Sequence, residues 1–448
     1  MMPTTHRYLA AAAAAFVMIA AAGLAAARSP AAPAATRTPV PTRVPPAASP
    51  TPEPSIRPVA PAPTPTLRDD VLGALGGRPA CVVVRRAGRD VLMISPERVL
   101  VPASTQKLLV AAAALDVLGP QHRFETSLKA EALAAHGVLG AVWLVGGGDP
   151  LLATPEYAAW LAASPRWREL SPTPMAHLAD ALVRAGVREV GAVRADAGRH
   201  ADAGVLDVWK AGSLADADIT PVSALTVNRG MAPWHPTPTP VGDPPLHAAS
   251  ELTRLLRERG VTVTADAEAG VAPTNGVRMA AVTSAPLADV LTGMLRASDN
   301  LGAEMLTREI GLRARGTGST AAGTAAVRDS LVDRGVDVRG LRMVDGSGLS
   351  GHNRASCGTL AGGLEAEPRL ARMLAVAGTN GTLRTRLVGT PLAGRLRGKT
   401  GWISGTVGFA GRLDDATVVM LQNGVPSLAV GRQAEEQVLH LVAERAGR

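Results

Sequence analysis

Residues 103–120 read ASTQKLLVAAAALDVLGP, and this stretch contains the most informative pattern in the chain. The run from Ala103 to Leu118 is strongly apolar, which predicts a buried helix, and Gly119-Pro120 is a typical helix stop. Ser104 and Lys107 lie three residues apart at its start and therefore project from one face. A serine hydroxyl needs a base to become a nucleophile, and a lysine amine with a lowered pKa can be that base. Taken alone, however, Ser104 is more economically explained as a capping serine beside an exposed lysine.

A second candidate motif is Ser298-Asp299-Asn300, which lies in a segment, Leu287 to Arg315, that we predict to be helical. A hydroxyl such as that of Ser298 can relay a proton to a leaving amine, and an amide such as that of Asn300 can bond both a substrate and a lysine. An ordinary polar helix face or turn would explain the same residues. This motif is therefore a weak signal by itself.

The third motif, Lys399-Thr400-Gly401, lies on a predicted strand region, Arg395 to Leu413. Glycines on both sides permit the close approach of another backbone or a ligand. A lysine and a threonine hydroxyl on an edge strand could bind a carboxylate, and a free N–H there could complete an oxyanion hole. A phosphate-binding loop is excluded, because Ala393 stands where the first glycine is required and a strand follows.

Lysine is rare in this chain, which makes its placement informative. The sequence has only four lysines against 42 arginines, and Lys107 and Lys399 fall in two of the three motifs. Lysine can deprotonate where arginine cannot. The three motifs together, in this order, are far more specific than any one of them.

Ser-x-x-Lys, Ser-x-Asn and Lys-Thr-Gly in this order resemble the signature of the penicillin-binding proteins and serine β-lactamases. The long stretch between the first two motifs points to one branch of these proteins. The chain resembles the D-alanyl-D-alanine carboxypeptidase/endopeptidase family, the DacB-like low-molecular-mass penicillin-binding proteins. The resemblance covers about residue 69 to the end. Further strings agree with it: Leu118–Pro120, Arg123–Thr126, Leu144–Pro150, Ser223–Asn228, Asp345–Ser350 and Gly381–Leu383.

This resemblance implies an α/β (α+β) fold with an antiparallel sheet flanked by helices, split by an inserted mixed α/β domain. It implies three catalytic residues: Ser104 as the acylated nucleophile, Lys107 as its general base and Ser298 as a proton shuttle. The substrate-binding residues that it implies are Asn300, Lys399, Thr400, Gly401 and Trp402, with an oxyanion hole made by the backbone N–H groups of Ser104 and Trp402.

The implied activity is that of a serine-type D-Ala-D-Ala carboxypeptidase, which some family members combine with endopeptidase cleavage of cross-links. Its substrate would be the D-Ala-D-Ala end of a peptidoglycan stem peptide, β-lactams would be covalent inhibitors, and no cofactor is implied. The residue after Lys-Thr-Gly is often Thr or Ser in this family, whereas here it is Trp402. This departure favours one alternative, a non-catalytic wall-peptide-binding protein on the same fold. A β-lactamase is a second alternative, although it would lack so large an insertion.

Composition sets two segments at the N-terminus apart from the rest of the chain. Residues 1–27 combine a short basic start with an apolar run and an A-x-A-like end, which predicts an export signal or, alternatively, an uncleaved membrane anchor. Residues 28–68, rich in Pro, Ala and Thr, predict a disordered tether. We expect the peptidase domain over 69–127 and 285–448 and the inserted domain over 128–284. We expect the protein to be exported and to reside in the cell wall or periplasmic space.

Several other classes of site are unfavoured. Scattered basic residues and only 11 aromatic residues argue against nucleic-acid binding, and the nine dispersed histidines against a metal site. Cys81 and Cys357 either form one disulfide or remain free buried thiols. We expect Trp160 and Trp167 to serve in packing and Glu304 to be a solvated helix charge. Two loops, Gly146–Pro150 and Asp345–Ser350, are expected to be structural. Ser347, in the second loop, is expected to border the site.

Overall fold

The computed structural model describes residues 66–445, so the predicted signal segment and most of the predicted tether lie outside the described residues. The first helix, α1 (Leu67–Leu75), begins two residues before residue 69, where the peptidase domain was expected to start. The Thr66 hydroxyl accepts from the Asp69 N–H at 3.2 Å, and the Asp69 carboxylate accepts from the Thr66 N–H at 3.0 Å. This reciprocal cap satisfies N–H groups that the first turn leaves unpaired, which explains the earlier start.

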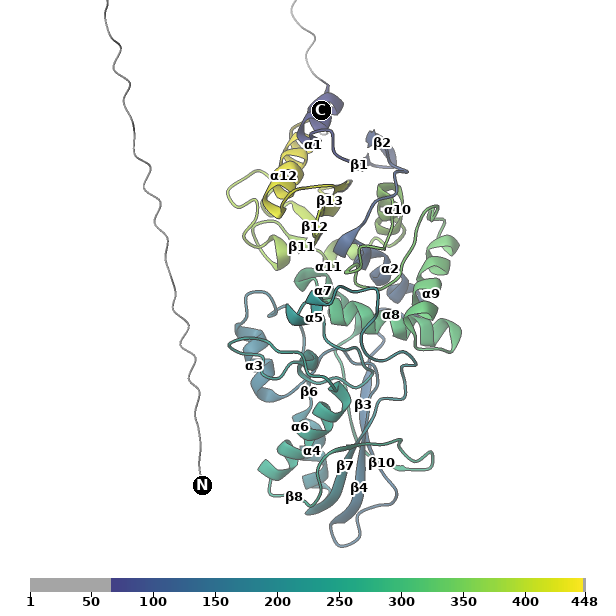
Figure 1. The fold of residues 1–448 in the computed structure, drawn as a ribbon, viewed down its shortest axis with the longest axis vertical. Helices are drawn as coiled ribbons and strands as arrows, with labels where there is room; N and C mark the ends of the chain where they lie inside the picture. Colours follow the sequence, from purple (N-terminus) through teal and green to yellow (C-terminus); the bar gives the residue numbers. More distant parts are fainter. Residues whose placement is uncertain (1–65, 446–448) are drawn as a thin grey trace, which may run out of the picture. The chain divides into compact units, whose positions relative to one another are not determined.

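The first sheet joins both ends of the described chain (Figure 1). All of its strand pairs are antiparallel, in the order β11-β12-β13-β14-β1-β2. Two β-rich runs, 81–86 and 90–95, separated by Ala87-Gly88-Arg89, predict an N-terminal hairpin, which β1 and β2 confirm. The predicted strand region 395–413 forms two strands that Ser404-Gly405 connects. The strands are β1 (Ala80–Arg86), β2 (Arg89–Ile94), β11 (Ala375–Val376), β12 (Leu396–Ile403), β13 (Thr406–Leu413) and β14 (Ala416–Asn423).

Both faces of this sheet are covered, because successive side chains of a strand point to opposite faces. In β1, Val83 packs into a cluster with helices α2 and α8–α10, whereas Val82 packs into a cluster with α1 and α12. This two-sided burial explains why β1 and β14 are almost continuously apolar. The covering helices are α2 (Lys107–Val117), α8 (Asn300–Arg315), α9 (Thr320–Asp333), α10 (Cys357–Ala366) and α12 (Leu428–Arg445), with the short α11 (Leu370–Met373) beside them.

A second, mixed sheet is built from residues between the first and second motifs. Its strands run β10-β3-β4-β7-β8, with β9 also paired to β7. The boundary predicted between residues 127 and 128 falls inside β3, and the division into domains stays a prediction. The elements here are β3 (Glu125–Ala130), β4 (Val138–Val145), β5 (Leu152–Ala153), β6 (Thr173–Pro174), β7 (Glu189–Asp196), β8 (Thr262–Val263), β9 (Glu268–Ala269), β10 (Val277–Thr283), α3 (Pro155–Ala163), α4 (Ala176–Arg184), α5 (Gly212–Ala215) and α6 (Pro244–Glu258).

The Gly146–Pro150 string makes a tight turn after β4, as expected of a structural loop. A Cβ on Gly147 would lie 1.7 Å from the carbonyl oxygen of Glu125, and one on Gly148 would lie 2.1 Å from Glu309 Oε1. Only glycine allows these segments to approach so closely. None of the residues of this turn lines the active-site cavity described below.

The predicted helix over Leu287–Arg315 is in fact two helices. The first, α7 (Leu287–Ala297), ends where Ser298 adopts a left-handed conformation with φ 58° and ψ 44°, and α8 begins at Asn300. A left-handed residue cannot continue a right-handed helix, so the chain changes direction at the second motif. This break lets Ser298 and Asn300 contact different partners.

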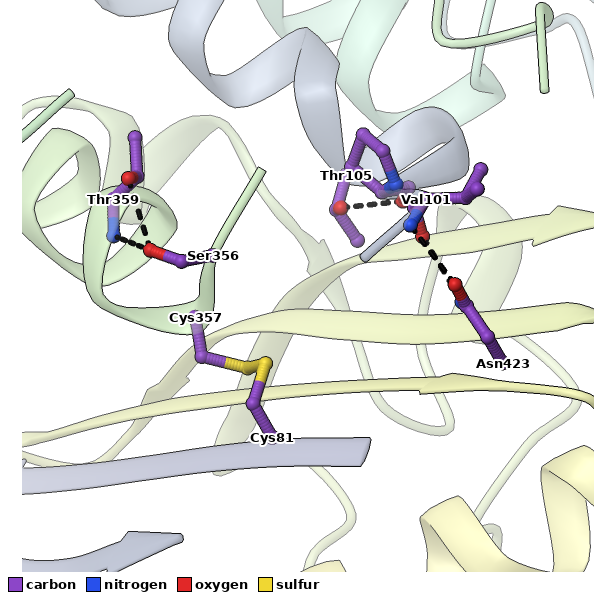
Figure 2. Close-up of a disulfide and its surroundings, with 8 residues drawn as sticks. Cys81, Val101, Thr105, Ser356, Cys357, Thr359 and Asn423 are labelled. Atoms are coloured by element: carbon purple, nitrogen blue, oxygen red, sulfur yellow. Dashed lines mark hydrogen bonds between the residues drawn. A yellow bond between two sulfur atoms is a disulfide. The ribbon is translucent and has the colours of Figure 1, made fainter. Parts of the chain in front are cut away.

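The two cysteines form a disulfide between β1 and the first residue of α10 (Figure 2). Both half-cystines are fully buried, and the bond joins residues 276 positions apart. Next to it, the Ser356 side chain caps α10 by accepting from the Thr359 N–H at 3.0 Å. The bond therefore ties the central sheet to a helix of the C-terminal part of the domain.

We expect a double Cys81→Ala, Cys357→Ala variant to lose about 2–5 kcal/mol of unfolding free energy, because the cross-link restricts the unfolded chain. Urea unfolding of the purified protein, with and without a phosphine reductant, measures this loss. The double variant itself should not respond to the reductant. Equal stability of the oxidised and reduced native chains would contradict the prediction.

Within residues 66–445, no helix is both long and apolar enough to cross a membrane.

Candidate active site

The first motif lies on a 3-10 turn, η1 (Ala103–Gln106), that leads directly into α2. In such a turn residues three apart are eclipsed, and Lys107 Nζ accordingly lies 2.8 Å from Ser104 Oγ. The turn is fixed to the sheet, since Asn423 of β14 accepts from the Val101 N–H at 3.0 Å (Figure 2). Ser104 is only partly buried, whereas Lys107 is fully buried beneath it.

Lys107 has two further partners, both contributed by distant segments. Its Nζ donates to Asn300 Oδ1 at 2.7 Å and to the Ser347 carbonyl at 2.5 Å. Burial lowers the pKa of Lys107 to about 8, although the carboxylates of Asp345, Asp299 and Glu304 act in the opposite direction. A substantial fraction of this amine is therefore neutral near pH 8, as a general base requires.

The second motif is oriented by the break between α7 and α8. Ser298 Oγ accepts from Lys399 Nζ at 2.9 Å. Asn300 Nδ2 donates to the Asp218 carbonyl at 2.8 Å, while its Oδ1 faces Lys107. The motif thus contacts both lysines of the other two motifs at once. Between these residues, the buried Asp299 forms an ion pair with Arg229.

Lys399 is the second fully buried lysine of the site. Its Nζ also donates to the Thr400 carbonyl at 2.7 Å. Burial, reinforced by the nearby cations Lys107 and Arg166, holds the pKa of Lys399 well below its usual value of 10.5. A carboxylate bound at this position would oppose both effects and favour the charged ammonium.

Strand β12 presents an open edge next to the nucleophile. The short β11 pairs only with Arg397 and Gly398, so no described strand pairs with the outer edge of β12 beyond them. The Leu396 carbonyl points to that edge, where it accepts from the Ala377 N–H. Because backbone direction alternates along a strand, the N–H of Trp402 points to the same edge.

The remaining residues of the third motif lie close to the nucleophile's turn. A Cβ on Gly401 would lie 2.9 Å from the Pro102 carbonyl oxygen, so glycine is needed for β12 to approach η1. The Thr400 hydroxyl donates to the Thr382 hydroxyl at 2.9 Å. The side chain of Trp402 is 36% exposed and lies in the wall of a cavity.

That cavity, of about 560 Å³, brings the three motifs to a common space. Of the predicted site residues, its walls include Ser104, Ser298, Asn300 and Trp402, and the fully buried Lys107 and Lys399 are not among its wall residues. The other lining residues are Val101, Arg166, Lys210, Gly212, Ser213, Asp216, Asp218, Leu349, Gly351, Ile403, Ser404 and Thr406. Thr400 and Gly401 do not line the cavity either, and they precede Trp402 on β12. Four of the eight predicted residues therefore line the cavity, and Lys107 and Lys399 contact two of these four, Ser104 and Ser298.

The section between the first two motifs supplies charged walls that the sequence analysis missed, namely Arg166, Lys210, Asp216 and Asp218. They lie on loops and short turns, so no periodic pattern marks them. Trp160 stacks on Tyr157 with ring centroids 5.3 Å apart, which confirms its expected packing role. Trp167 lies between hydrophobic neighbours and the guanidinium of Arg229, 3.9 Å from its ring centroid.

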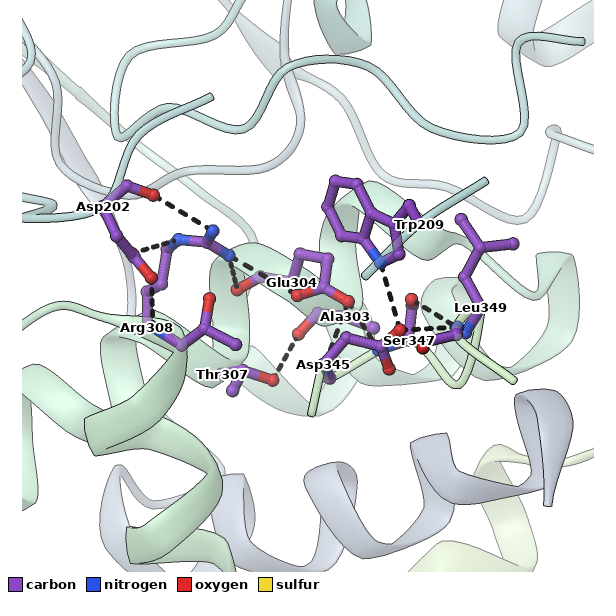
Figure 3. Close-up of polar contacts among 12 residues, drawn as sticks. Asp202, Trp209, Ala303, Glu304, Thr307, Arg308, Asp345, Ser347 and Leu349 are labelled. Carbon is purple, nitrogen blue, oxygen red and sulfur yellow. Dashed lines mark hydrogen bonds and ion pairs between the residues drawn. The ribbon is translucent and has the colours of Figure 1, made fainter. Parts of the chain in front are cut away.

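The prediction for Glu304 is wrong, since its side chain is 0% exposed and contacts the Asp345–Ser350 loop (Figure 3). Its Oε1 accepts from the N–H groups of Gly346, at 2.9 Å, and Ser347, at 2.7 Å. A signal was present, because spacing of four places Asn300, Glu304 and Arg308 on one helix face. That face is buried because it packs against the loop behind the nucleophile.

The Asp345–Ser350 loop is structural, as expected, and it reaches the site through its backbone. The buried carboxylate of Asp345 accepts from Trp209 Nε1 at 3.0 Å, the Ser350 N–H at 2.7 Å and Asn353 Nδ2 at 2.8 Å. Ser347 borders the site as predicted, but through its carbonyl oxygen on Lys107 rather than through its hydroxyl. Among residues 66–445, no group of three or more His, Cys, Asp or Glu side chains could hold a metal ion.

Comparison with known proteins agrees with this geometry. A model of the family described as D-Ala-D-Ala carboxypeptidase 3 (S13) matches residues 68–246 and 235–445. A carboxypeptidase of Mycobacterium tuberculosis is 32% identical over 366 residues, covering 78% of this chain and 74% of that protein. The D-alanyl-D-alanine carboxypeptidase of Actinomadura sp. (strain R39) is 31% identical over 415 residues, covering 77% of this chain and 76% of that protein.

The crystal structure of penicillin binding protein 4 (dacB) from Haemophilus influenzae superposes with a TM-score of 0.71 at 22% identity, covering 83% of this chain and 98% of that chain. At this identity the similarity concerns the fold, and it confirms the predicted fold class. The family match confirms the resemblance drawn from the three motifs. The chain therefore belongs to the D-Ala-D-Ala carboxypeptidase 3 (S13) family and is a serine peptidase.

Proposed function

We propose that this serine peptidase removes the terminal D-Ala from peptidoglycan stem peptides through an acyl-enzyme on Ser104. The observation that carries the proposal is the contact of 2.8 Å between Ser104 Oγ and Lys107 Nζ. It combines a nucleophile open to a cavity with a buried amine of lowered pKa. Two related protein names, carboxypeptidase and D-alanyl-D-alanine carboxypeptidase, support the substrate class.

Acylation follows from these positions. Neutral Lys107 takes the hydroxyl proton of Ser104, and Oγ attacks the carbonyl carbon of the penultimate D-Ala. The oxyanion that forms is stabilised by the N–H groups of Ser104 and Trp402, the latter on the open edge of β12. Ser298, hydrogen-bonded to Lys399, gives its hydroxyl proton to the amine of the departing D-Ala and receives in its place the proton that Lys107 took, so both side chains return to their starting form. Water then hydrolyses the ester and regenerates Ser104.

The terminal carboxylate of the substrate would bind at the third motif. Lys399 supplies the cation and Thr400 a hydroxyl, which in the free protein donates to Thr382. Because burial disfavours the charged form of Lys399, binding of an anion should be accompanied by proton uptake at its Nζ. Trp402 adds no second hydroxyl, so recognition of the substrate carboxylate rests on Lys399 and Thr400. β-Lactams also carry a carboxylate near the reactive carbonyl and would use the same contacts.

The proposal is tested by D-Ala release from a synthetic peptide ending in Lys-D-Ala-D-Ala, detected with a D-amino-acid oxidase assay. The peptide ending in D-Ala-L-Ala is the matched control and should not be cleaved, as followed by the mass of the peptide, because the oxidase does not detect L-Ala. Mass spectrometry after incubation with benzylpenicillin should show a stable adduct on Ser104. An adduct that disappears within seconds would favour a β-lactamase, and a folded protein with neither adduct nor D-Ala release would favour a wall-peptide-binding protein.

Acylation by benzylpenicillin should accelerate as the pH rises towards about 8, the pKa to which burial lowers Lys107. Below that pH the amine holds a proton and cannot accept one from Ser104, so the rate should fall about tenfold per pH unit. Above pH 8 it should level off. The second-order rate of adduct formation between pH 6 and 10 measures this dependence, and a flat profile over the range would contradict it.

We also propose that the protein is exported and acts in the cell wall or periplasmic space, either released or held by residues 1–27. The apolar run followed by Ala25-Ala26-Ala27 supports this location. Intact mass of the protein isolated from its own cells distinguishes the two forms, since cleavage removes these residues. Recovery of the full-length chain from the soluble cytoplasm would contradict export.

A further inference from the structure

We infer that Glu304 is a positioning residue that holds the Ser347 carbonyl against Lys107, and that the section between the first two motifs holds Glu304 in turn. The inference rests on the proposed role of Lys107 as the general base. It concerns a residue four positions after Asn300, on the same face of α8, that belongs to none of the three motifs.

The backbone of residues 346 and 347 connects the Glu304 carboxylate to the Lys107 amine. Glu304 Oε1 accepts from the N–H groups of Gly346 and Ser347, while the Ser347 carbonyl accepts from Lys107 Nζ at 2.5 Å. Residue 347 therefore donates through its N–H to the Glu304 carboxylate and accepts through its carbonyl from the Lys107 amine. Glu304, Ser347 and Lys107 are all fully buried, so water cannot replace either contact.

The other oxygen of Glu304 faces Arg308, which is also fully buried (Figure 3). Arg308 Nη1 donates to the Glu304 carbonyl at 3.1 Å, and its Nε donates to Asp202 Oδ1 at 2.9 Å. Asp202 also accepts from the Thr320 N–H at 2.8 Å, which fixes its orientation. The contacts therefore run from Asp202 through Arg308 and Glu304 to Lys107.

Among the described carboxylates, only Glu304 accepts from the N–H groups of Gly346 and Ser347. The oxygens of the neighbouring Asp345 are occupied by Trp209, Gly348, Ser350 and Asn353. Asp299, which also raises the pKa of Lys107, is paired with Arg229. Of the three carboxylates that act on Lys107, only Glu304 accepts from the N–H of residue 347, whose carbonyl Lys107 contacts, while Asp345 accepts from the next N–H, that of Gly348.

Glu304 should influence Lys107 by charge as well as by geometry. Burial and the repulsion of Asp345 raise the pKa of Glu304 to about 7, with Arg308 and the Ser347 N–H opposing the shift. Near pH 8, where Lys107 titrates, most of Glu304 is therefore ionised. Its negative charge stabilises the ammonium form of Lys107, so removal of that charge should move the rising limb of the acylation profile to lower pH.

Three variants test this role, each assayed by the rate of benzylpenicillin adduct formation between pH 6 and 10. Glu304→Ala leaves two buried N–H groups unpaired and should lower the rate on the order of 10- to 100-fold. Glu304→Gln retains an acceptor oxygen and should recover most of that rate, with its rising limb about half to one pH unit lower. A merely structural role of Glu304 would not move the limb.

Glu309→Gln is the matched control. Glu309 is a buried carboxylate on the same helix, where it binds Arg199 and His200 of the section between the motifs and contacts no motif residue. This variant should lose stability without a change in the pH of the limb. The inference is overturned if Glu304→Gln keeps the native limb, or if Glu309→Gln shifts it equally. A native chain that forms no adduct at any pH would instead overturn the proposed function.

Discussion

Ser104→Ala should abolish the benzylpenicillin adduct and lower the rate of D-Ala release by at least about 10⁴-fold. Among the described partners of Lys107 Nζ, only Ser104 offers a hydroxyl, the others being the Asn300 amide and the Ser347 carbonyl. Ser298 contacts Lys399 and not Lys107, so it is not placed to lose its proton to the proposed base. The measurement is intact-protein mass together with D-Ala release over several hours.

Ser250→Ala provides the control for this variant. Ser250 lies on α6, is exposed, and donates only within its own helix, to the Leu246 carbonyl. It should acylate at the native rate. An adduct of undiminished yield on folded Ser104→Ala protein would show that another residue is the nucleophile.

Lys107→Met should reduce acylation by about 10³- to 10⁴-fold while preserving the fold. Methionine has a similar length and suits a fully buried position, but it cannot accept the proton of Ser104. The loss should persist at every pH from 6 to 10, because no titrating amine remains beside Oγ. Adduct formation followed by mass over hours measures the residual rate.

Lys129→Met is the matched control, since Lys129 lies on β3 and outside the cavity. It should retain native acylation and the native pH profile. If Lys107→Met reacts within tenfold of the native rate, Lys107 is not the base, and Lys399, the other buried lysine with a lowered pKa, becomes the candidate.

The two buried lysines show how much local sequence reveals about a site. Their motifs and their rarity among 42 arginines were sufficient to select both residues. The chain alone could not show that Lys107 contacts Asn300, 193 positions away, or the Ser347 carbonyl, 240 positions away. The pKa of about 8 depends on this burial, and burial is a property of the assembled core rather than of any local window.

Glu304 and Ser298 show the converse. Both lie in a segment whose apolar periodicity predicts one helix. That pattern does not predict the left-handed conformation of Ser298, which depends on tertiary contacts. The same pattern does not distinguish a solvated glutamate from one that caps a loop. Only the packing of α8 against residues 345–350 turns Glu304 inward.

By itself, the sequence predicted the helix after Ser104, the N-terminal hairpin, the strands near the C-terminus and the three motifs, because periodicity, turn residues and motif spacing are local properties. Tertiary structure decided the rest: the disulfide pairing, the open edge of β12, the charged walls from Arg166 to Asp218, and the buried contacts from Asp202 to Lys107. These features arise where distant segments exclude water together, and the strength and charge state of polar groups depend on that exclusion.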